Sequence, residues 1–135
     1  MSAAADSEVR IYGAGLSGMV AGINLARQGY RVVIFDRESG IGGSHDVHPS
    51  VHTKPLQPKE TWDYIGLHLS EYFVATDTYP AFWYNSRLIK LPPYVNNTKA
   101  YDLERGLRHS SIDNHLYRLS VDAGVEFRFG HALTS

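Results

Sequence analysis

The sequence contains no cysteine, and it also lacks the long apolar runs and the charge excess that mark several functional classes. Without cysteine, the chain can form neither disulfides nor thiolate metal sites, and it has no thiol for catalysis. No apolar run reaches the roughly 18 residues needed to span a bilayer, and the opening MSAAADSEVR lacks the basic and apolar regions of a signal peptide. The formal net charge of -1 argues against a nucleic-acid partner. These absences predict a cytoplasmic protein.

The N-terminal segment has the pattern of a βαβ unit. Residues 9–13 form a short apolar run typical of a strand, and residues 16–28 have helical character that ends at Gly29. The run RVVIFD at 31–36 contains a continuous β-branched and aromatic stretch, as expected of a strand buried on both faces of a parallel sheet. A strand, a glycine turn, a helix and a second strand within about 30 residues predict a right-handed crossover.

Periodicity weakens in the middle of the chain. The turn-forming residues of 40–58 predict a loop, and Pro58 suits the first turn of a helix that continues to residue 73. Two strands are then expected over 73–79 and 81–93, the second folded on itself at Asn85-Ser86. We interpret residues 44–100 as an irregular, β-rich insertion within one domain that spans residues 1–135.

Regular patterning returns near residue 110. The tetrapeptide SSID has the form of a capping box, with Ser110 as the N-cap and Asp113 three residues later. Apolar residues then recur on one helical face up to Gly124, which suits a C-cap, and VEFRF at 125–129 alternates like a strand. The fold class predicted is α/β, a Rossmann-type three-layer dinucleotide-binding domain with a parallel sheet and the small β-rich insertion.

The stretch IYGAGLSG at 11–18 places three glycines at the spacing G-x-G-x-x-G, namely Gly13, Gly15 and Gly18. The first permits a tight turn, the second leaves no Cβ between the main chain and a pyrophosphate, and the third lets helix and strand pack closely. The N–H groups near Leu16, Ser17 and Gly18 then point toward the phosphates at the positive end of the helix dipole. Asp36 is placed to accept hydrogen bonds from an adenosine ribose and to repel the 2′-phosphate of NADP. The motif predicts dinucleotide binding.

The stretch DRESGIGG at 36–43 adds a pair of glycines, Gly42 and Gly43, beyond the acid. This pattern resembles the extended FAD signature of the glutathione-reductase-type flavoproteins, a group that includes p-hydroxybenzoate hydroxylase and the geranylgeranyl reductases. The resemblance implies that Asp36 takes the ribose hydroxyls and that Arg37 lies beside the adenine. It also implies that Gly43 and Ser44 approach the pyrophosphate of FAD. NAD is the alternative cofactor, and the paired glycines argue against it.

A second resemblance covers residues 101–135. In the hydroxylase and geranylgeranyl reductase branch, an arginine precedes a hydrophobic-Asp pair and a helix, and a Gly-Val strand follows. Ile112-Asp113 and Gly124-Val125 match this pattern. The resemblance implies a cofactor-binding arginine at Arg108, with His109 at the usual spacing and Arg105 as a further candidate. It also implies that main chain near Ala132 approaches the adenine.

In these flavoproteins the N-terminal segment holds mainly the ADP half of FAD, and later segments hold the ribitol and cover the isoalloxazine. The chain ends at Ser135, before either. By this resemblance it is the N-terminal part of an FAD-dependent oxidoreductase of the reductase or monooxygenase type, incomplete and catalytically silent alone, with unknown catalytic residues. The parent enzyme is expected to bind FAD as its cofactor and to take electrons from NAD(P)H or another donor. Its expected substrate is apolar and isoprenoid-like, and peripheral membrane association of the parent enzyme is left open. If the chain ends naturally at Ser135, a non-catalytic nucleotide-binding or interaction module is the alternative.

Three histidines, His45, His48 and His52, lie close together in the sequence SHDVHPSVH. Their spacing would allow imidazoles to cluster around a metal ion, but Pro49 breaks any helix that would align them. We therefore expect no metal site and interpret the segment as a polar loop beside the cofactor, in which a histidine near the flavin is the functional alternative.

Aromatic residues are concentrated in the middle of the chain, at Trp62, Tyr64, Tyr94 and in YPAFWY at 79–84. Large aromatic side chains most often form core, although they also line apolar substrate channels. We expect these residues to belong to the core.

Overall fold

The computed structural model describes residues 7–43, 50–55, 58–76, 81–90 and 100–133. The chain divides into two compact units, of which the first contains residues 1–50 and 104–135 and the second contains residues 51–103. Among the described residues, no helix has the length and apolar character needed to cross a membrane.

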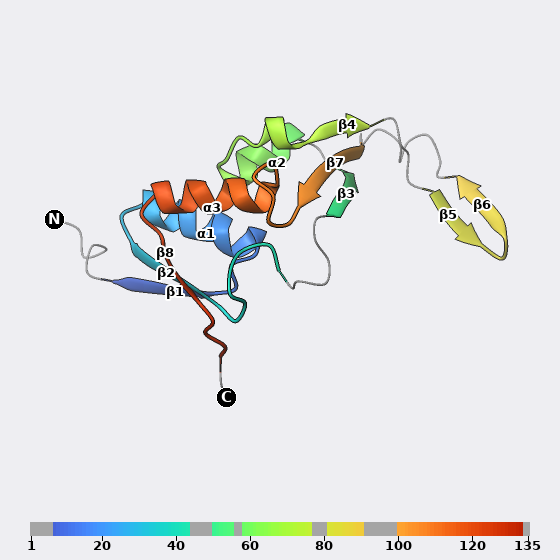
Figure 1. The fold of residues 1–135 in the computed structure, drawn as a ribbon. Helices are drawn as coiled ribbons and strands as arrows, with labels where there is room; N and C mark the ends of the chain where they lie inside the picture. Colours follow the sequence, from blue (N-terminus) through green and yellow to red (C-terminus); the bar gives the residue numbers. More distant parts are fainter. Residues whose placement is uncertain (1–6, 44–49, 56–57, 77–80, 91–99, 134–135) are drawn as a thin grey trace. The chain divides into compact units, whose positions relative to one another are not determined.

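The first unit is a parallel sheet covered by two helices (Figure 1). Its elements are β1 (Glu8–Tyr12), α1 (Leu16–Arg27), β2 (Arg31–Asp36), α3 (Ile112–Asp122) and β8 (Glu126–Phe129). The strand order is β1-β2-β8, and both pairings are parallel. This arrangement confirms the prediction of a Rossmann-type α/β fold with a parallel sheet. In the described part of this unit, α1 and α3 pack together on one face of the sheet, so the structure shows two layers there.

Burial explains why the middle of β2 is apolar. It is the central strand of the sheet, and Val32, Val33 and Ile34 are almost completely inaccessible to solvent. Met19 and Ile23 of α1 are buried as well, and α3 contributes Ile112 and Leu116 to the core. Because β2 is rigidly packed, the residue at its carboxyl end, Asp36, has a well-defined position in the fold.

The start of α3 differs from the predicted capping box. Its N-cap is Ser111, not Ser110: the Ser111 Oγ accepts a hydrogen bond from the Asn114 N–H at 3.1 Å and donates to the Gly106 carbonyl. The Ser110 hydroxyl instead donates to Glu104 at 2.6 Å, and the Asp113 carboxylate is engaged outside the helix. The cap moves by one residue because Asp113 has stronger, charged partners than the main chain of the N-cap.

We expect Ser111→Ala to lower the free energy of unfolding by about 2 kcal/mol, because it removes both the cap and a buried hydrogen bond. Urea denaturation followed by circular dichroism measures this loss. The matched control is Ser110→Ala, whose hydroxyl is exposed, and we expect it to change stability by less than about 0.5 kcal/mol. A larger loss for Ser110→Ala than for Ser111→Ala would contradict the assignment of the cap.

The second unit is built from short strands and helices. They are β3 (Ser50–Pro55), α2 (Pro58–Ile65), a 3-10 turn η3 (Ser70–Tyr72), β4 (Val74–Thr76), β5 (Ala81–Tyr84), β6 (Arg87–Lys90) and β7 (Ala100–Arg105). The first residue of β3 and the last two residues of β7 are counted in the first unit. Strands β3, β7 and β4 form one sheet in that order, while β5 and β6 form a separate hairpin. The predicted fold-back at Asn85-Ser86 is confirmed, because both residues adopt positive φ, at 46° and 57°, as a two-residue hairpin turn requires.

Several expectations for this unit were wrong. The loop predicted over 40–58 contains β3, and β7 was not predicted at all. Their pairing joins segments far apart in the sequence, so local composition carries little sign of it. The helix that starts at Pro58 ends at Ile65 rather than at residue 73, because Gly66 adopts a φ of +69°.

The prediction that the middle aromatics form core was also wrong for Tyr64, Trp83 and Tyr84. Tyr64 is 92% exposed, and Trp83 and Tyr84 of β5 are 72% and 69% exposed. Among the described residues, the β5–β6 hairpin is a sheet of two strands, and a sheet of two strands does not bury large side chains by itself. Trp62 is half-buried and meets Phe73 edge-on at 6.3 Å, whereas Tyr94 lies outside the described residues.

Candidate functional site

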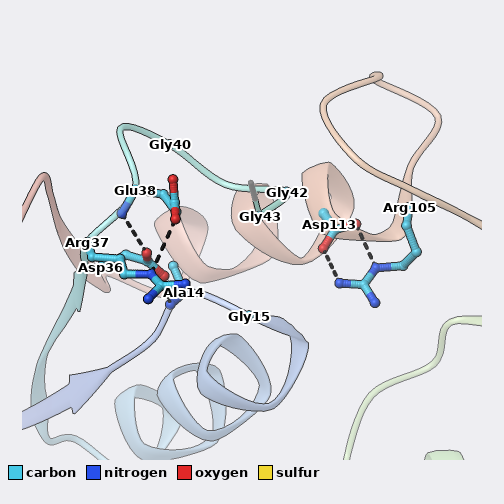
Figure 2. Close-up of a pocket in the computed structure, with 10 residues that line it drawn as sticks. All are labelled: Ala14, Gly15, Asp36, Arg37, Glu38, Gly40, Gly42, Gly43, Arg105 and Asp113. Carbon is cyan, nitrogen blue, oxygen red and sulfur yellow. Dashed lines mark hydrogen bonds and ion pairs between the residues drawn. The ribbon is translucent and has the colours of Figure 1, made fainter. Parts of the chain in front are cut away.

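Two hollows lie next to each other at the carboxyl ends of β1 and β2, and they share Asp36 and Arg37. The first, shown in Figure 2, is lined by the glycine turn, by the loop after β2, and by Arg105 and Asp113. The second is lined by Tyr12, Gly13, Phe35 and the segment His131–Leu133. The carboxyl end of a parallel sheet is where α/β folds bind their ligands.

The three glycines of the turn have different surroundings. Gly13 has a φ of +110°, and its N–H donates to the Phe35 carbonyl at 2.7 Å, which joins the turn to β2. A Cβ on Gly18 would collide with the Gly13 carbonyl oxygen, so α1 approaches β1 as closely as the main chain allows. A Cβ on Gly15 would meet nothing within 4 Å, so its main chain faces open space. This turn therefore combines a tight helix–strand contact with exposed main chain beside the N-terminus of α1.

The carboxylate of Asp36 faces the glycine turn (Figure 2). Its Oδ2 accepts a hydrogen bond from the Ala14 N–H at 2.5 Å, and its Oδ1 accepts one from the Glu38 N–H at 2.9 Å. The side chain is half-buried and still lines both hollows. Two backbone donors thus hold a charged acceptor, with lone pairs left for a ligand, at the junction of the two hollows.

Three aromatic side chains line the second hollow, and sequence reasoning missed all of them. Tyr12 and Phe35 stack with ring centroids 5.2 Å apart, and His131 meets Phe35 edge-on at 6.1 Å. The His131 N–H donates to the Asp36 carbonyl at 2.8 Å, which brings the neighbouring Ala132 to the hollow. The sequence did indicate two of these side chains, because Tyr12 and Phe35 immediately precede the motif residues Gly13 and Asp36. In the structure, Tyr12 and Phe35 are neighbours across β1 and β2.

The paired glycines after β2 have a structural role of their own. Gly42 is buried with a φ of +93°, and a Cβ at this position would lie 3.1 Å from the Gly106 carbonyl carbon. Only a glycine allows this approach between the loop after β2 and the segment after β7. Gly43 has a φ of +77° and lines the first hollow, and Ser44 lies outside the described residues.

The structure places Arg105, not Arg108, at the first hollow. Arg105 forms a bidentate ion pair with Asp113. Arg108 is exposed, and its Nη1 lies 3.6 Å from Glu104 Oε1. His109, at the spacing usual for the resemblance, contacts Arg118 instead. Leu16, Ser17 and Gly18 form the first turn of α1, as expected, and their binding of a cofactor stays a prediction.

The structure describes little of the histidine segment. His45 and His48 lie outside the described residues, and His52 belongs to β3. Where the chain is described, no group of three or more metal-binding side chains gathers. The role of these histidines stays a prediction.

Sequence comparison relates the chain to nucleotide-binding proteins. The profile of the NAD(P)-binding Rossmann-like domain family matches residues 11–83. A probable UDP-galactopyranose mutase from Klebsiella pneumoniae is 35% identical over 95 residues, which cover 70% of this chain and 22% of that protein. The flavin-containing monooxygenase FMO GS-OX-like 7 of Arabidopsis thaliana is 42% identical over 50 residues, covering 37% of this chain and 11% of the plant protein. The chain thus spans about a fifth or less of the length of these relatives.

Solved structures with the same fold include a flavin-dependent monooxygenase and an oxygenase. The flavin-dependent monooxygenase PieE, solved in complex with FAD and substrate, matches with a TM-score of 0.63 and 17% identity, covering 96% of this chain and 25% of PieE. The tetrameric form of 2-methyl-3-hydroxypyridine-5-carboxylic acid oxygenase matches with a TM-score of 0.61 and 15% identity, covering 91% of this chain and 31% of the oxygenase. At such low identity these matches show the fold, and they agree with the Rossmann-type prediction.

Proposed function

The chain belongs to the family of NAD(P)-binding Rossmann-like domains, and from this premise we propose that it binds the ADP portion of FAD. In this proposal the chain is the N-terminal, nucleotide-binding part of an FAD-dependent oxidoreductase. The observation that carries it is the Asp36 carboxylate, which faces a glycine turn whose main chain is open at Gly15. An acceptor for ribose hydroxyls beside exposed N–H groups is the arrangement that an adenosine diphosphate needs.

The residues present fit this ligand. The main chain at Gly15 and the first turn of α1, with Leu16, Ser17 and Gly18, would hold the diphosphate. Asp36 would accept hydrogen bonds from the ribose hydroxyls, and the aromatic hollow next to Ala132 and Arg37 would receive the adenine. When bound, FAD supplies the electron and hydride transfer, and the residues of this chain bind and orient it.

Two observations favour FAD over NAD. The paired glycines Gly42 and Gly43 resemble the flavoprotein signature, and the relatives and structural neighbours named above include a flavin-containing monooxygenase and a monooxygenase solved with FAD. The narrower assignment to the geranylgeranyl reductase and p-hydroxybenzoate hydroxylase branch stays a prediction. The same holds for an apolar, isoprenoid-like substrate and for NAD(P)H as the electron donor.

Asp36→Asn tests the proposal. We expect wild-type chain to bind FAD and ADP with similar affinity, and the variant to bind both about tenfold more weakly, because it loses a charged acceptor. Discrimination against NADP relative to NAD should also fall, because the negative charge that repels the 2′-phosphate is gone. Isothermal titration calorimetry with FAD, ADP, NAD and NADP gives these affinities.

The matched control is Asp122→Asn, which changes an exposed carboxylate at the end of α3, away from both hollows. It should bind FAD and ADP as the wild type does. A wild-type preference for NAD over FAD, or equal ADP affinity of Asp36→Asn and wild type, would refute the proposed function.

A further inference from the structure

The β5–β6 hairpin (Figure 1) exposes large apolar side chains that nucleotide binding does not explain. Trp83 and Tyr84 are largely exposed, and Leu88 and Ile89 are 49% and 48% exposed. No hairpin residue lines either of the two hollows described above. Four such side chains beside one short turn form a concentrated apolar surface, which differs from the scattered exposure that is normal in proteins.

These side chains occupy both faces of the hairpin. The register pairs Trp83 with Leu88, and Tyr84 with Arg87. Trp83 and Leu88 share one face, because side chains alternate along a strand. Tyr84, Arg87 and Ile89 share the other face for the same reason. A hairpin that lies flat on a protein surface buries one face and keeps the other polar. The distribution here fits instead a hairpin whose tip enters a medium that surrounds both faces.

The charge around the hairpin has one sign. Between Asp77 and Asp102 the sequence contains no acidic residue, although the whole chain has 14. The same stretch contains three basic residues, Arg87, Lys90 and Lys99, and the first of them is exposed in the structure. Since the net charge of the chain is -1, the rest of the chain has an excess of acid. Positive charge beside exposed apolar side chains complements an anionic, partly apolar surface.

The residue types match the headgroup region of a lipid bilayer. Tryptophan and tyrosine are enriched there because each combines an apolar ring with a polar group. The turn residues Asn85 and Ser86 are polar, and among the described residues no third strand pairs with the hairpin. The free main-chain groups at its edges stay hydrated at headgroup level, whereas the hydrocarbon core would leave them without partners. The hairpin therefore suits shallow binding at the surface of a bilayer.

From these observations we propose that the β5–β6 hairpin binds the surface of a bilayer that contains anionic phospholipids. Its four exposed apolar side chains enter the headgroup region, and Arg87 lies beside the negatively charged headgroups. The binding is reversible, because one short hairpin buries little apolar area. A second copy of the chain is a poorer occupant, since it would bring the same basic residues together. The surface is separate from the two hollows, so the inference does not depend on the proposed function.

The fluorescence of Trp83 tests the proposal in the 135-residue chain. The chain has two tryptophans, and the variant Trp62→Phe leaves Trp83 as the only emitter. The probes are vesicles of phosphatidylcholine alone and vesicles with about one third phosphatidylserine. With the mixed vesicles we expect the emission to shift to shorter wavelength and the chain to sediment with the lipid. Binding to phosphatidylcholine alone should be about tenfold weaker or more, because the electrostatic attraction is absent.

Two substitutions in the hairpin separate its charge from its apolar surface. We expect Arg87→Gln to weaken sedimentation with the mixed vesicles about fivefold. Arg87→Lys should bind as the wild type does, because a bilayer responds to the charge rather than to the planar shape of a guanidinium. Trp83→Ser should weaken binding about tenfold. The matched controls are Tyr64→Ser, an exposed aromatic residue of α2, and Arg10→Gln, an exposed arginine of β1, which should both bind as the wild type does.

Other results would contradict the proposal. Unchanged Trp83 emission with the mixed vesicles, equal binding to both kinds of vesicle, or equal losses for Tyr64→Ser and Trp83→Ser would each overturn it. So would self-association without lipid that Trp83→Ser abolishes, since the hairpin would then join copies of the chain. Circular dichroism should show the same melting transition for wild type and hairpin variants, because the substituted side chains are exposed. A chain that binds ADP but not the mixed vesicles refutes this inference and leaves the proposed function standing.

Discussion

Gly18→Ala is expected to destabilise the chain by about 3 kcal/mol, because a Cβ there has no room that side-chain movement can create. The new methyl group would collide with the Gly13 carbonyl oxygen and lie 3.2 Å from the carbonyl carbon, so main chain must shift. The shift separates α1 from β1 at the point where the glycine turn is formed. We therefore expect nucleotide binding to be lost together with stability.

Gly22→Ala is the matched control, one turn later in the same helix. Its Cβ would lie 3.0 Å from Ile34 Cδ1, which is the movable end of a side chain, and 3.6 Å from Val125 Cγ2. The gain of about 1 kcal/mol in helix propensity offsets part of this crowding. Thermal and urea denaturation should therefore show a change within about 1 kcal/mol for Gly22→Ala, and equal losses in the two variants would contradict the close helix–strand contact at Gly18.

Gly15→Ala is expected to have the opposite profile, with stability kept and affinity for ADP and FAD reduced about 100-fold. Gly15 has a φ of -78° and a ψ of 177°, which alanine adopts without strain, and a Cβ there meets no atom within 4 Å. Stability should stay level or rise by up to about 1 kcal/mol, because alanine restricts the unfolded chain. The methyl group projects into the open space where the diphosphate would lie, and this separates ligand from main-chain donors.

Calorimetry with ADP and adenosine, combined with thermal denaturation, tests this expectation. Adenosine is the internal control, because it has no diphosphate to collide with the new methyl group and should bind Gly15→Ala about as well as wild type. Unchanged ADP affinity in a folded Gly15→Ala variant would mean that the open main chain at Gly15 is not where the phosphates bind.

Gly15 and Gly18 show how much of the structure a sequence motif can predict. The spacing G-x-G-x-x-G predicts both positions, and the predicted strand, helix and second strand agree with β1, α1 and β2 to within about one residue at each end. The contacts among β1, α1 and β2 lie within a short span of chain, and the apolar run of β2 is one that a central strand must have. The position of Asp36 at the end of β2 follows from the same local pattern.

The arginine that lines the first hollow shows where that reach ends. The resemblance implies a cofactor-binding arginine at Arg108, with Arg105 as a further candidate, and the sequence does not choose between them. In the structure, Arg105 ends a strand that the sequence did not reveal, and its partner Asp113 was expected to cap α3. Whether a carboxylate caps its own helix or pairs with an arginine depends on which segment packs beside it, and that packing is a tertiary contact.

By itself, the sequence determined the βαβ unit, the glycine turn and the acid that faces it, because each arises from neighbouring residues whose propensities and burial agree. Only the tertiary structure decided the pairing of β3 with β7, the contact between Gly42 and Gly106, the exposure of Trp83 and Tyr84, and the place of Arg105, rather than Arg108, on the lining of the first hollow. The strand pairing, the glycine contact and the place of Arg105 depend on segments distant in the chain that meet only after folding. The free energy that holds them together comes from burial and charge pairing, which no local pattern encodes.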